Sequence, residues 1–386
     1  MKKILYFFLA SMLLLSCDGM DVPDTGEGGT SDQGTTEQEK VHVLTLTADT
    51  YYIKAGSDDA CEFAVCLNGE PLEEGFVIRN ITAGTEHSGT SFSAAEVGET
   101  RFSASYELSE DGETIVLTTS PVTVEAVTYD VPAAVQDPDS SNLSFVKRVL
   151  FTQFTGTECT ACPAMKLALY QFLAREDVEG KVVLAAAHCG IFTDGDPAKL
   201  NEGLDQALGA NVKPHLDINL KQRSWQTTSG TDRLQSEFNA AYRSADAKGG
   251  IAVSPILDNG VLRIKVSVKA ALKDKFRVGL WLLEDGIEGV QQGADSDDEF
   301  YTIHDKCVRA VCGEVKDQED YSGVLLGDID QGGTAEHVFE IPVEEKWVLE
   351  NCHMAVFITT PNAKGKYYVN NVVDCPLTGQ TPYEYK

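Results

Sequence analysis

Apolar and polar residues alternate along residues 41–128, and this period of two is typical of half-buried β-strands. Residues 43–47 (Val-Leu-Thr-Leu-Thr) and 102–106 (Phe-Ser-Ala-Ser-Tyr) show the alternation most clearly. Turn sequences such as Asn68-Gly69 separate the runs. The pattern predicts an immunoglobulin-like β-sandwich at 41–128, followed by a proline-containing linker at 129–144.

The pattern changes to that of an α/β segment at residues 145–247. An apolar run at 146–154 predicts a strand, and the apolar residues Met165, Leu169 and Phe172 after it fall on one face of a helix. Residues 181–188 form a second apolar run, which suits a parallel strand buried on both faces. Residues 232–245 have the spacing of an amphipathic helix.

Short strands separated by turns return at 248–386, which predicts a C-terminal β-sandwich. A chain of this length is too long for one hydrophobic core. The predicted fold class is multidomain β and α/β. An α/β domain at 145–247 is flanked by an N-terminal immunoglobulin-like β-sandwich and a C-terminal β-sandwich.

The first residues of the chain predict export and lipid anchoring. Lys2 and Lys3 precede an apolar stretch at 4–16 that is too short to span a bilayer. Leu14-Leu15-Ser16-Cys17 resembles the lipobox of bacterial lipoproteins, which implies a signal peptide at 1–16 and lipidation of Cys17. An ordinary secretory peptide is the alternative. Residues 17–40 have the composition of a flexible tether.

The formal net charge of −29 argues against a nucleic-acid partner and against docking of the protein surface on anionic lipid. Membrane contact is therefore expected through the lipid on Cys17. No phosphate loop, Ser/His/Asp set or paired-carboxylate motif is recognised, and no cofactor or metal is predicted. Asp194-Gly195-Asp196 lacks the spacing of a helix–loop–helix calcium site, so a solvated loop is the favoured interpretation.

The candidate chemistry lies in Cys159-Thr160-Ala161-Cys162, between the first predicted strand and helix of the α/β segment. A thiol at a helix N-terminus is favoured as thiolate, so Cys159 is the predicted nucleophile and Cys162 the resolving thiol. Pro214 precedes the next strand and resembles the cis-proline beside the disulfide of thioredoxin-like proteins. These residues indicate that the predicted α/β domain is thioredoxin-like, and they predict a thiol–disulfide oxidoreductase with a protein or small-thiol partner. The alternatives are a structural disulfide, a generic turn proline and a non-catalytic binding or adhesion module.

Neighbouring residues weaken the redox prediction. Glu158 opposes formation of a thiolate at Cys159, and Gln153 stands where thioredoxins carry a buried acid. His188 ends the second apolar run, and a solvated histidine is favoured there over one that activates Cys159. A zinc site built from Cys159, Cys162, His188 and Cys189 is a further alternative.

The other cysteines allow no firm pairing. Ten cysteines, less Cys17 and the Cys159/Cys162 pair, leave an odd set of seven. Cys307 or Cys312 could bridge to Cys352 or Cys375, and buried thiols that pack as small apolar side chains are the alternative.

The motif as a whole resembles the twenty-eight-kilodalton outer-membrane protein family of Gram-negative lipoproteins. Phe154-Thr155-Gly156 before the cysteines, Leu283-Glu284-Asp285-Gly286, Gln291-Gln292 and the segment 304–309 carry the resemblance, which covers residues 145–386. The resemblance implies a thioredoxin-like domain joined to a β-sandwich, and a lipid-anchored protein of the cell outer membrane that faces the periplasm or the surface. It implies no particular activity.

Overall fold

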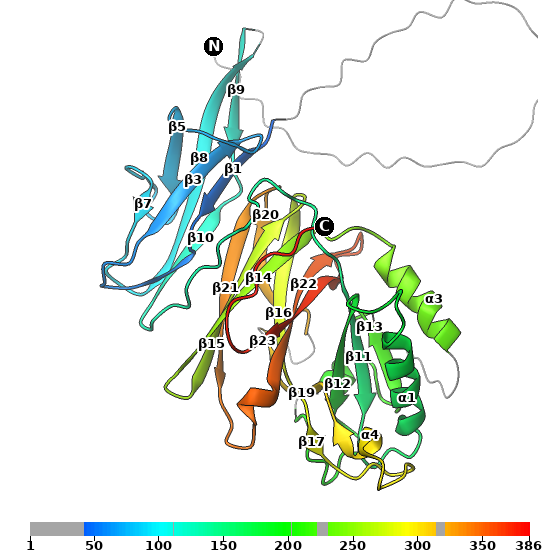
Figure 1. The fold of residues 1–386 in the computed structure, drawn as a ribbon. Coiled ribbons are helices and arrows are strands. Elements are labelled where there is room, and N and C mark those ends of the chain that lie inside the picture. The colour runs from blue at the N-terminus through cyan, green and yellow to red at the C-terminus, as the bar shows by residue number, and fades with distance from the viewer. Residues whose placement is uncertain (1–41, 111, 202, 222–230, 314–320) are drawn as a thin grey trace, which may run out of the picture. The chain divides into compact units, whose positions relative to one another are not determined.

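The computed structural model describes residues 42–386 except 111, 202, 222–230 and 314–320 (Figure 1). The predicted signal peptide, Cys17 and the tether therefore lie outside the described residues. None of the helices in the described part is both long and apolar enough to cross a membrane.

Two sheets form the N-terminal part of the described chain. The first contains β1 (Leu44–Ala48), β3 (Cys61–Leu67), β4 (Glu70–Pro71) and β7 (Ser91–Phe92). The second contains β2 (Tyr52–Lys54), β10 (Val122–Val127), β8 (Gly98–Glu110), β5 (Phe76–Asn80), β6 (Thr85–Glu86) and β9 (Glu113–Thr118). Inward-facing residues of both sheets, among them Phe63 and Phe102, share one core. The alternation in the sequence thus places every second side chain between the sheets.

One mixed sheet of eight strands runs through the rest of the molecule, in the order β13-β11-β12-β19-β16-β22-β23 with β20 also paired to β16. Its members are β11 (Val149–Thr155), β12 (Val182–His188), β13 (His215–Ile218), β16 (Asp274–Glu284), β19 (Cys307–Cys312), β20 (Val324–Ile329), β22 (Cys352–Pro361) and β23 (Tyr367–Pro376). β11 is parallel to β12 and antiparallel to β13. β12 is in turn parallel to β19 at Ala186 and Cys307.

Helices cover only one end of this sheet (Figure 1). α1 (Cys162–Leu173) and α3 (Thr231–Tyr242) pack on β11–β13, where Met165, Phe172 and Phe238 share a core with Phe151. The other helical segments are short, namely α2 (Leu204–Ala207), α4 (Glu299–Thr302) and the 3-10 turn η1 (Leu349–Asn351).

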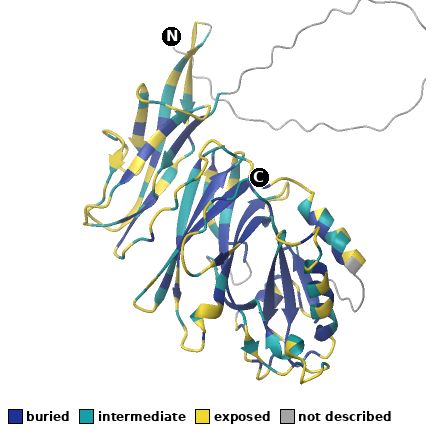
Figure 2. Ribbon diagram, viewed as in Figure 1, coloured by how far each residue is buried: buried dark blue, intermediate teal, exposed yellow. Residues whose placement is uncertain are grey.

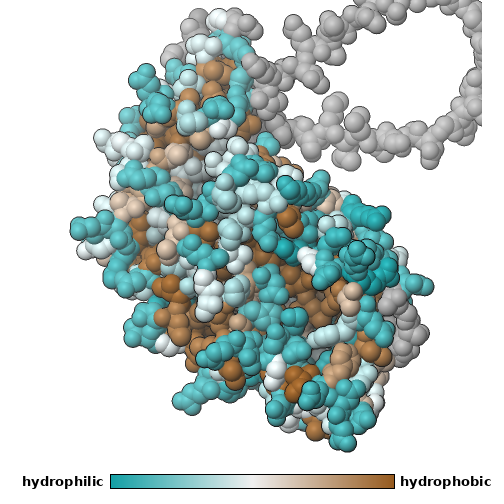
Figure 3. Space-filling view, in the orientation of Figure 1, coloured by the Kyte–Doolittle hydropathy of each residue, from teal (hydrophilic) through white to brown (hydrophobic). Residues whose placement is uncertain are grey.

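A three-stranded sheet packs against the other end of the large sheet. It consists of β14 (Gly249–Asp258), β15 (Val261–Ala270) and β21 (Thr334–Pro342), and its apolar face meets β16 and β22 in the largest core. β17 (Ile287–Glu288) and β18 (Ile303–His304) form a separate pair. β11, β12, β16 and β22 of the large sheet are dark blue over most of their length in Figure 2 and are buried at nearly every position, so both faces of these strands are covered. Hydrophilic residues cover much of the face shown in Figure 3.

The predicted fold class is wrong. Strands dominate the described chain, with twenty-three strands against four α-helices, and residues 145–247 do not form a separate thioredoxin-like α/β domain between two sandwiches. β12 has an edge that β11 does not use, and β19 pairs with that edge, so the sheet continues into the C-terminal strands. Trp281 and Phe357 from those strands pack in the same core as Phe154 and Ala185. A shared sheet and a shared core make the two segments one structural unit.

Candidate functional site around the Cys159–Cys162 disulfide

The two motif cysteines are bonded to each other at the start of α1. Their Cα atoms are 5.4 Å apart, and the residues are only 2% and 1% exposed. Cys159 N donates to Gly156 O at 3.0 Å and Cys162 N donates to Cys159 O at 3.2 Å, so the backbone turns tightly into the helix. Pro163 occupies the first turn, where its missing N–H leaves no helical bond unmade. The predicted motif is therefore present as a buried disulfide.

A segment from the C-terminal half covers the loop that carries Cys159. The Gln291 side-chain nitrogen donates toward three carbonyl oxygens, those of Gly156 at 3.2 Å, Thr157 at 3.1 Å and Cys159 at 3.0 Å. The backbone N–H of Gln292 donates to Thr157 O at 2.7 Å. One buried amide thus satisfies several carbonyls that would otherwise lack donors.

Two glycines allow the backbone segments on either side of the loop to come this close. A Cβ at Gly156 would lie 2.3 Å from Phe192 O, and a Cβ at Gly293 would lie 2.5 Å from Thr160 O. Gly293 also has φ +82°, a conformation that other residues rarely adopt. The loop is therefore held between residues 192–196 and residues 289–293.

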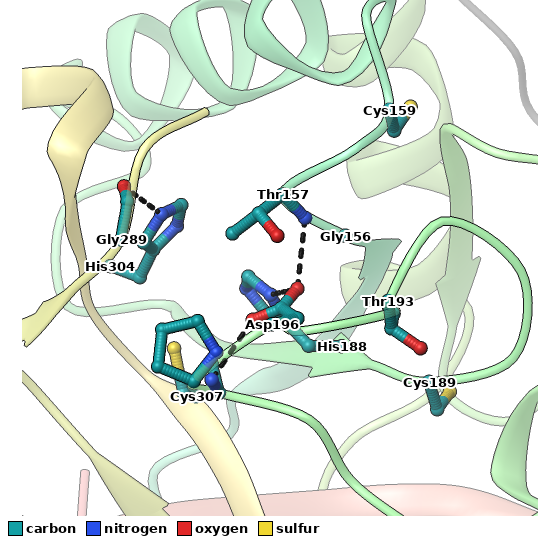
Figure 4. A network of polar contacts seen from close by, with 12 residues as sticks. Gly156, Thr157, Cys159, His188, Cys189, Thr193, Asp196, Gly289, His304 and Cys307 are labelled. Atoms are coloured by element: carbon teal, nitrogen blue, oxygen red, sulfur yellow. Dashed lines mark hydrogen bonds and ion pairs between the residues drawn. The ribbon is translucent and has the colours of Figure 1, made fainter. Parts of the chain in front are cut away.

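A buried ion pair lies beneath the loop (Figure 4). His188 Nδ1 donates to Asp196 Oδ2 at 2.8 Å, and the backbone N–H groups of Thr157 and Ala198 donate to the same carboxylate at 2.8 Å and 2.9 Å. Burial alone would raise the pKa of Asp196, but the hydrogen bond and charge of His188 and the two backbone donors lower it to about 2. Asp196 is therefore an anion that fixes the end of β12 to the loop before Cys159.

This ion pair corrects two predictions. His188 is buried, so it is not the solvated residue that the sequence favoured at a strand end. Asp196 is buried as well, whereas the side chain of Asp194 is exposed, so only part of the acidic cluster is a solvated loop. His188 lies eight residues before Asp196, and the sequence pattern does not show that the two side chains meet in the interior.

A second histidine extends the cluster. His304 Nε2 donates to Gly289 O at 3.0 Å, and its ring lies edge-on to His188 with 5.1 Å between centroids. Burial lowers the pKa of His304 to about 4, and the charge of His188 acts in the same direction. His304 is therefore neutral near pH 7. Its hydrogen bond connects β18 to Gly289, the first residue of the segment 289–293 that covers the loop.

Pro214 follows a cis peptide bond at Lys213 and directly precedes β13. The buried Lys213 donates its ammonium to Ile191 O at 3.2 Å, and burial lowers its pKa. The role of Pro214 beside a reactive disulfide stays a prediction.

The remaining seven cysteines form no disulfide among the described residues, so the predicted bridges from Cys307 or Cys312 to Cys352 or Cys375 are absent there. Burial raises the pKa of the Cys61, Cys189, Cys352 and Cys375 thiols to about 12. Five of the seven are buried, which matches thiols that pack as small apolar groups. No cluster of three or more His, Cys, Asp or Glu in the described part of the chain has the arrangement of a metal site.

Sequence analysis alone did not assign a role to Gln291, Gly293 or Asp196. Gln291 belongs to a segment that carries the family resemblance, and this resemblance is the only signal for Gln291 in the sequence. Its distance of more than 130 residues from the loop carbonyls hides the contact from any local pattern.

Comparison with known proteins adds little. No family model and no curated protein match the chain. Among solved structures, HBP35 of Porphyromonas gingivalis aligns with 13% identity and a TM-score of 0.47, over 62% of this chain and 78% of that chain. A DUF3823 family protein from Bacteroides ovatus aligns with 15% identity and a TM-score of 0.17, over 33% of this chain and 53% of that chain. This chain therefore spans about half the length of the second protein. Because both TM-scores lie below 0.5, neither likeness supports a conclusion about fold or function.

Proposed function

We propose that this chain is a non-catalytic, lipid-anchored binding protein of the cell envelope, in which the Cys159–Cys162 disulfide has a structural role. The observation that carries the proposal is the burial of both cysteines under a segment that is hydrogen-bonded to their loop. Thiol–disulfide exchange requires a thiolate to reach a sulfur atom, so restricted access slows it. The disulfide instead holds the entry to α1 in one conformation.

The residues around the disulfide favour the same conclusion. Gln153 is buried at the position where thioredoxins carry a proton-shuttling acid, and an amide cannot carry the proton. Glu158 adds negative charge beside Cys159. His188, the last residue of β12, is hydrogen-bonded to Asp196. It is therefore not oriented toward Cys159 as an activating base.

The envelope location is part of the proposal. It is supported by the lipobox-like sequence ending in Cys17 and by a composition at 17–40 that suits a tether. Membership of the twenty-eight-kilodalton outer-membrane protein family and anchoring in the outer membrane stay predictions, since they depend on the resemblance alone.

A thiol–disulfide oxidoreductase is the competing function, and one observation favours it. The disulfide lies at the N-terminus of α1, where the backbone dipole stabilises a thiolate once the bond is reduced. An enzyme of this kind would use Cys159 as nucleophile and a protein or small thiol as partner.

One pair of measurements separates the two functions. We expect the protein not to accelerate insulin reduction by dithiothreitol. We also expect Cys159→Ala/Cys162→Ala to lower the free energy of unfolding by about 2 kcal/mol, because a short covalent loop is lost. Cys66→Ala, which removes a half-buried thiol elsewhere, is the control for cysteine loss. Turnover that disappears in Cys159→Ser, with unfolding unchanged in the double variant, would overturn the proposal.

A further inference from the structure

The three-stranded sheet has a polar outer face, on the side away from the largest core. Residues 262, 264, 266, 268 and 270 of β15 lie in that core, so Lys265 and Ser267 face the opposite side. Glu336 of β21 is the register partner of Ser267 and shares its face. Lys265 is only 2% exposed although it is charged. A charged side chain in such a place needs hydrogen-bond partners.

The partners of this buried pair are unequal. The Glu336 carboxylate accepts from Tyr51 N at 2.8 Å and from Ser267 Oγ at 2.5 Å. Lys265 Nζ lies 3.6 Å from Glu336 Oε2, so the two charges offset each other. Lys265 donates one hydrogen bond, to Thr50 Oγ1 at 2.8 Å, whereas an ammonium group has three N–H bonds. Lys265 therefore has donors without an acceptor among the described residues.

A cleft of about 790 Å³ lies over this polar face. Lys265, Ser267 and Glu336 line it from the sheet. Residues 131–137 of the linker and residues 48–53 of the N-terminal part form further walls. The volume is within the range of about 300–1,000 Å³ that is typical of small-molecule sites. The unused donors of Lys265 therefore border a space large enough for a ligand.

Tyr383 brings a second free donor to the same cleft. The side chain packs with Phe145 and Ala252, and the residue is only 5% exposed. Its hydroxyl makes no hydrogen bond with any described residue. Burial raises the pKa of Tyr383 well above its usual value, and the charges of Glu336 and Asp137 act in the same direction, so the hydroxyl keeps its proton. A buried donor without a partner favours a ligand that supplies an acceptor.

The charges around the cleft favour a neutral ligand. At the sheet, Lys265 and Glu336 offset each other and leave no net charge for an ion to pair with. Asp49, Asp58 and Asp59 line the cleft and are exposed, and Lys265 is the only lysine or arginine among the described lining residues. An anion would therefore be repelled at the rim, and a cation would meet the Lys265 ammonium at the sheet.

We propose that this cleft binds a neutral, polyhydroxylated ligand, namely a sugar unit of an uncharged glycan. The oxygen atoms of a sugar accept hydrogen bonds from the Lys265 ammonium and the Tyr383 hydroxyl. Its hydroxyl groups donate to carboxylates such as Glu336, which can accept more than the two bonds it has. The inference rests on the proposed binding function and deepens it by naming a class of ligand.

The test uses the full chain on an array that carries neutral oligosaccharides beside sialylated and sulfated forms of the same glycans. We expect binding to one or more neutral glycans and loss of that binding when the glycan carries a negative charge. The same oligosaccharide free in solution should compete with the immobilised one. Binding to no neutral glycan, or binding to the charged forms alone, would overturn the proposal.

A variant of Tyr383 locates the site. Tyr383→Phe removes a hydroxyl that bonds no described residue, so the free energy of unfolding should not change. We expect it to weaken binding of the array-selected glycan about fivefold in isothermal titration, because one hydrogen bond to the ligand is lost. Tyr170→Phe makes the same change at a half-buried residue of α1 outside the cleft and should leave the affinity unchanged. An unchanged affinity in Tyr383→Phe, or an equal loss in Tyr170→Phe, would contradict this location.

Hydrogen exchange gives an independent readout. Bound glycan should slow amide exchange at residues 133–137, which form one wall of the cleft, and should leave α1 unaffected. Protection elsewhere without protection of this wall would place the ligand outside the cleft and overturn the proposal. The redox assays of the proposed function use no glycan, so the two claims can fail separately. Turnover of insulin with glycan binding retained would overturn only the structural role of the disulfide.

Discussion

The half-buried His353 is held by two carboxylates from other parts of the chain. Its two ring nitrogens lie 2.5 Å from Asp374 and 3.5 Å from Asp285. Burial lowers the pKa of His353, but hydrogen bonds to Asp285 and Asp374 outweigh it and raise the pKa to about 9. The histidine is therefore charged in the folded protein near pH 7.

This raised pKa predicts a loss of stability at alkaline pH. The folded state holds the His353 proton up to about pH 9, whereas the unfolded chain releases it near pH 6.5. The stabilisation is complete below about pH 6.5 and is lost as the pH rises through 9. We expect the free energy of unfolding to fall by up to about 3 kcal/mol across this window. Urea unfolding at several pH values measures it, and His353→Gln should flatten the profile. An unchanged slope in the variant would contradict the assignment.

At the scale of elements, the loop before α1 depends on a segment of the C-terminal half. The loop at 156–160 has no side-chain cap at the start of α1, since the N-cap residue is Ala161. Its carbonyls are satisfied by Gln291, and residues 289–293 close over it. The disulfide and the covering segment therefore stabilise the same turn.

Removing the Gln291 amide should destabilise the fold. We expect Gln291→Ala to lower the free energy of unfolding by about 1–3 kcal/mol, because buried carbonyls lose their donor. Gln291→Glu should cost more, since its carboxylate would face the same oxygen atoms. Gln292→Ala is the matched control, because residue 292 contacts the loop through its backbone N–H. Equal effects of Gln291→Ala and Gln292→Ala in chemical denaturation would argue against the side-chain contact.

At the scale of the whole described chain, polar contacts join the N-terminal strands to the C-terminal sheets. Asp330 accepts from Ser120 N at 2.7 Å and Ser120 Oγ at 3.0 Å, and pairs with Lys273 at 2.7 Å. Glu336 accepts from Tyr51 N at 2.8 Å. Tyr51, Tyr52 and Val127 also pack with Val338 in a small apolar cluster. Small interfaces of this mixed kind are typical of segments that can separate without unfolding.

Loss of Asp330 should loosen this connection. We expect Asp330→Ala to speed amide exchange at Thr119, Ser120 and Val122 several-fold and to increase proteolysis within 129–144, without a matching loss of order in β11 or α1. Asp328→Ala removes an exposed carboxylate near the end of β20, two residues before Asp330, and is the control. Faster exchange throughout the chain would indicate general destabilisation instead.

The sequence by itself determined the local elements and the position of the site. Apolar runs at 146–154 and 181–188 contain most of β11 and β12, and the cysteine pair lies at the start of α1 as its spacing predicted. The spacing of apolar residues in a helix or a strand is a local property, so it can be recognised within a single segment of the sequence. The predicted fold class was wrong because the fold class depends on which strands pair with each other. Only the tertiary structure decided that β19 pairs with β12, that Gln291 covers Cys159, and that Asp196 is buried against His188. The first two contacts join segments far apart in sequence, and the third joins two side chains eight positions apart that are buried together. All three form because burial of apolar surface and pairing of polar groups favour them, and no local pattern in the sequence shows this.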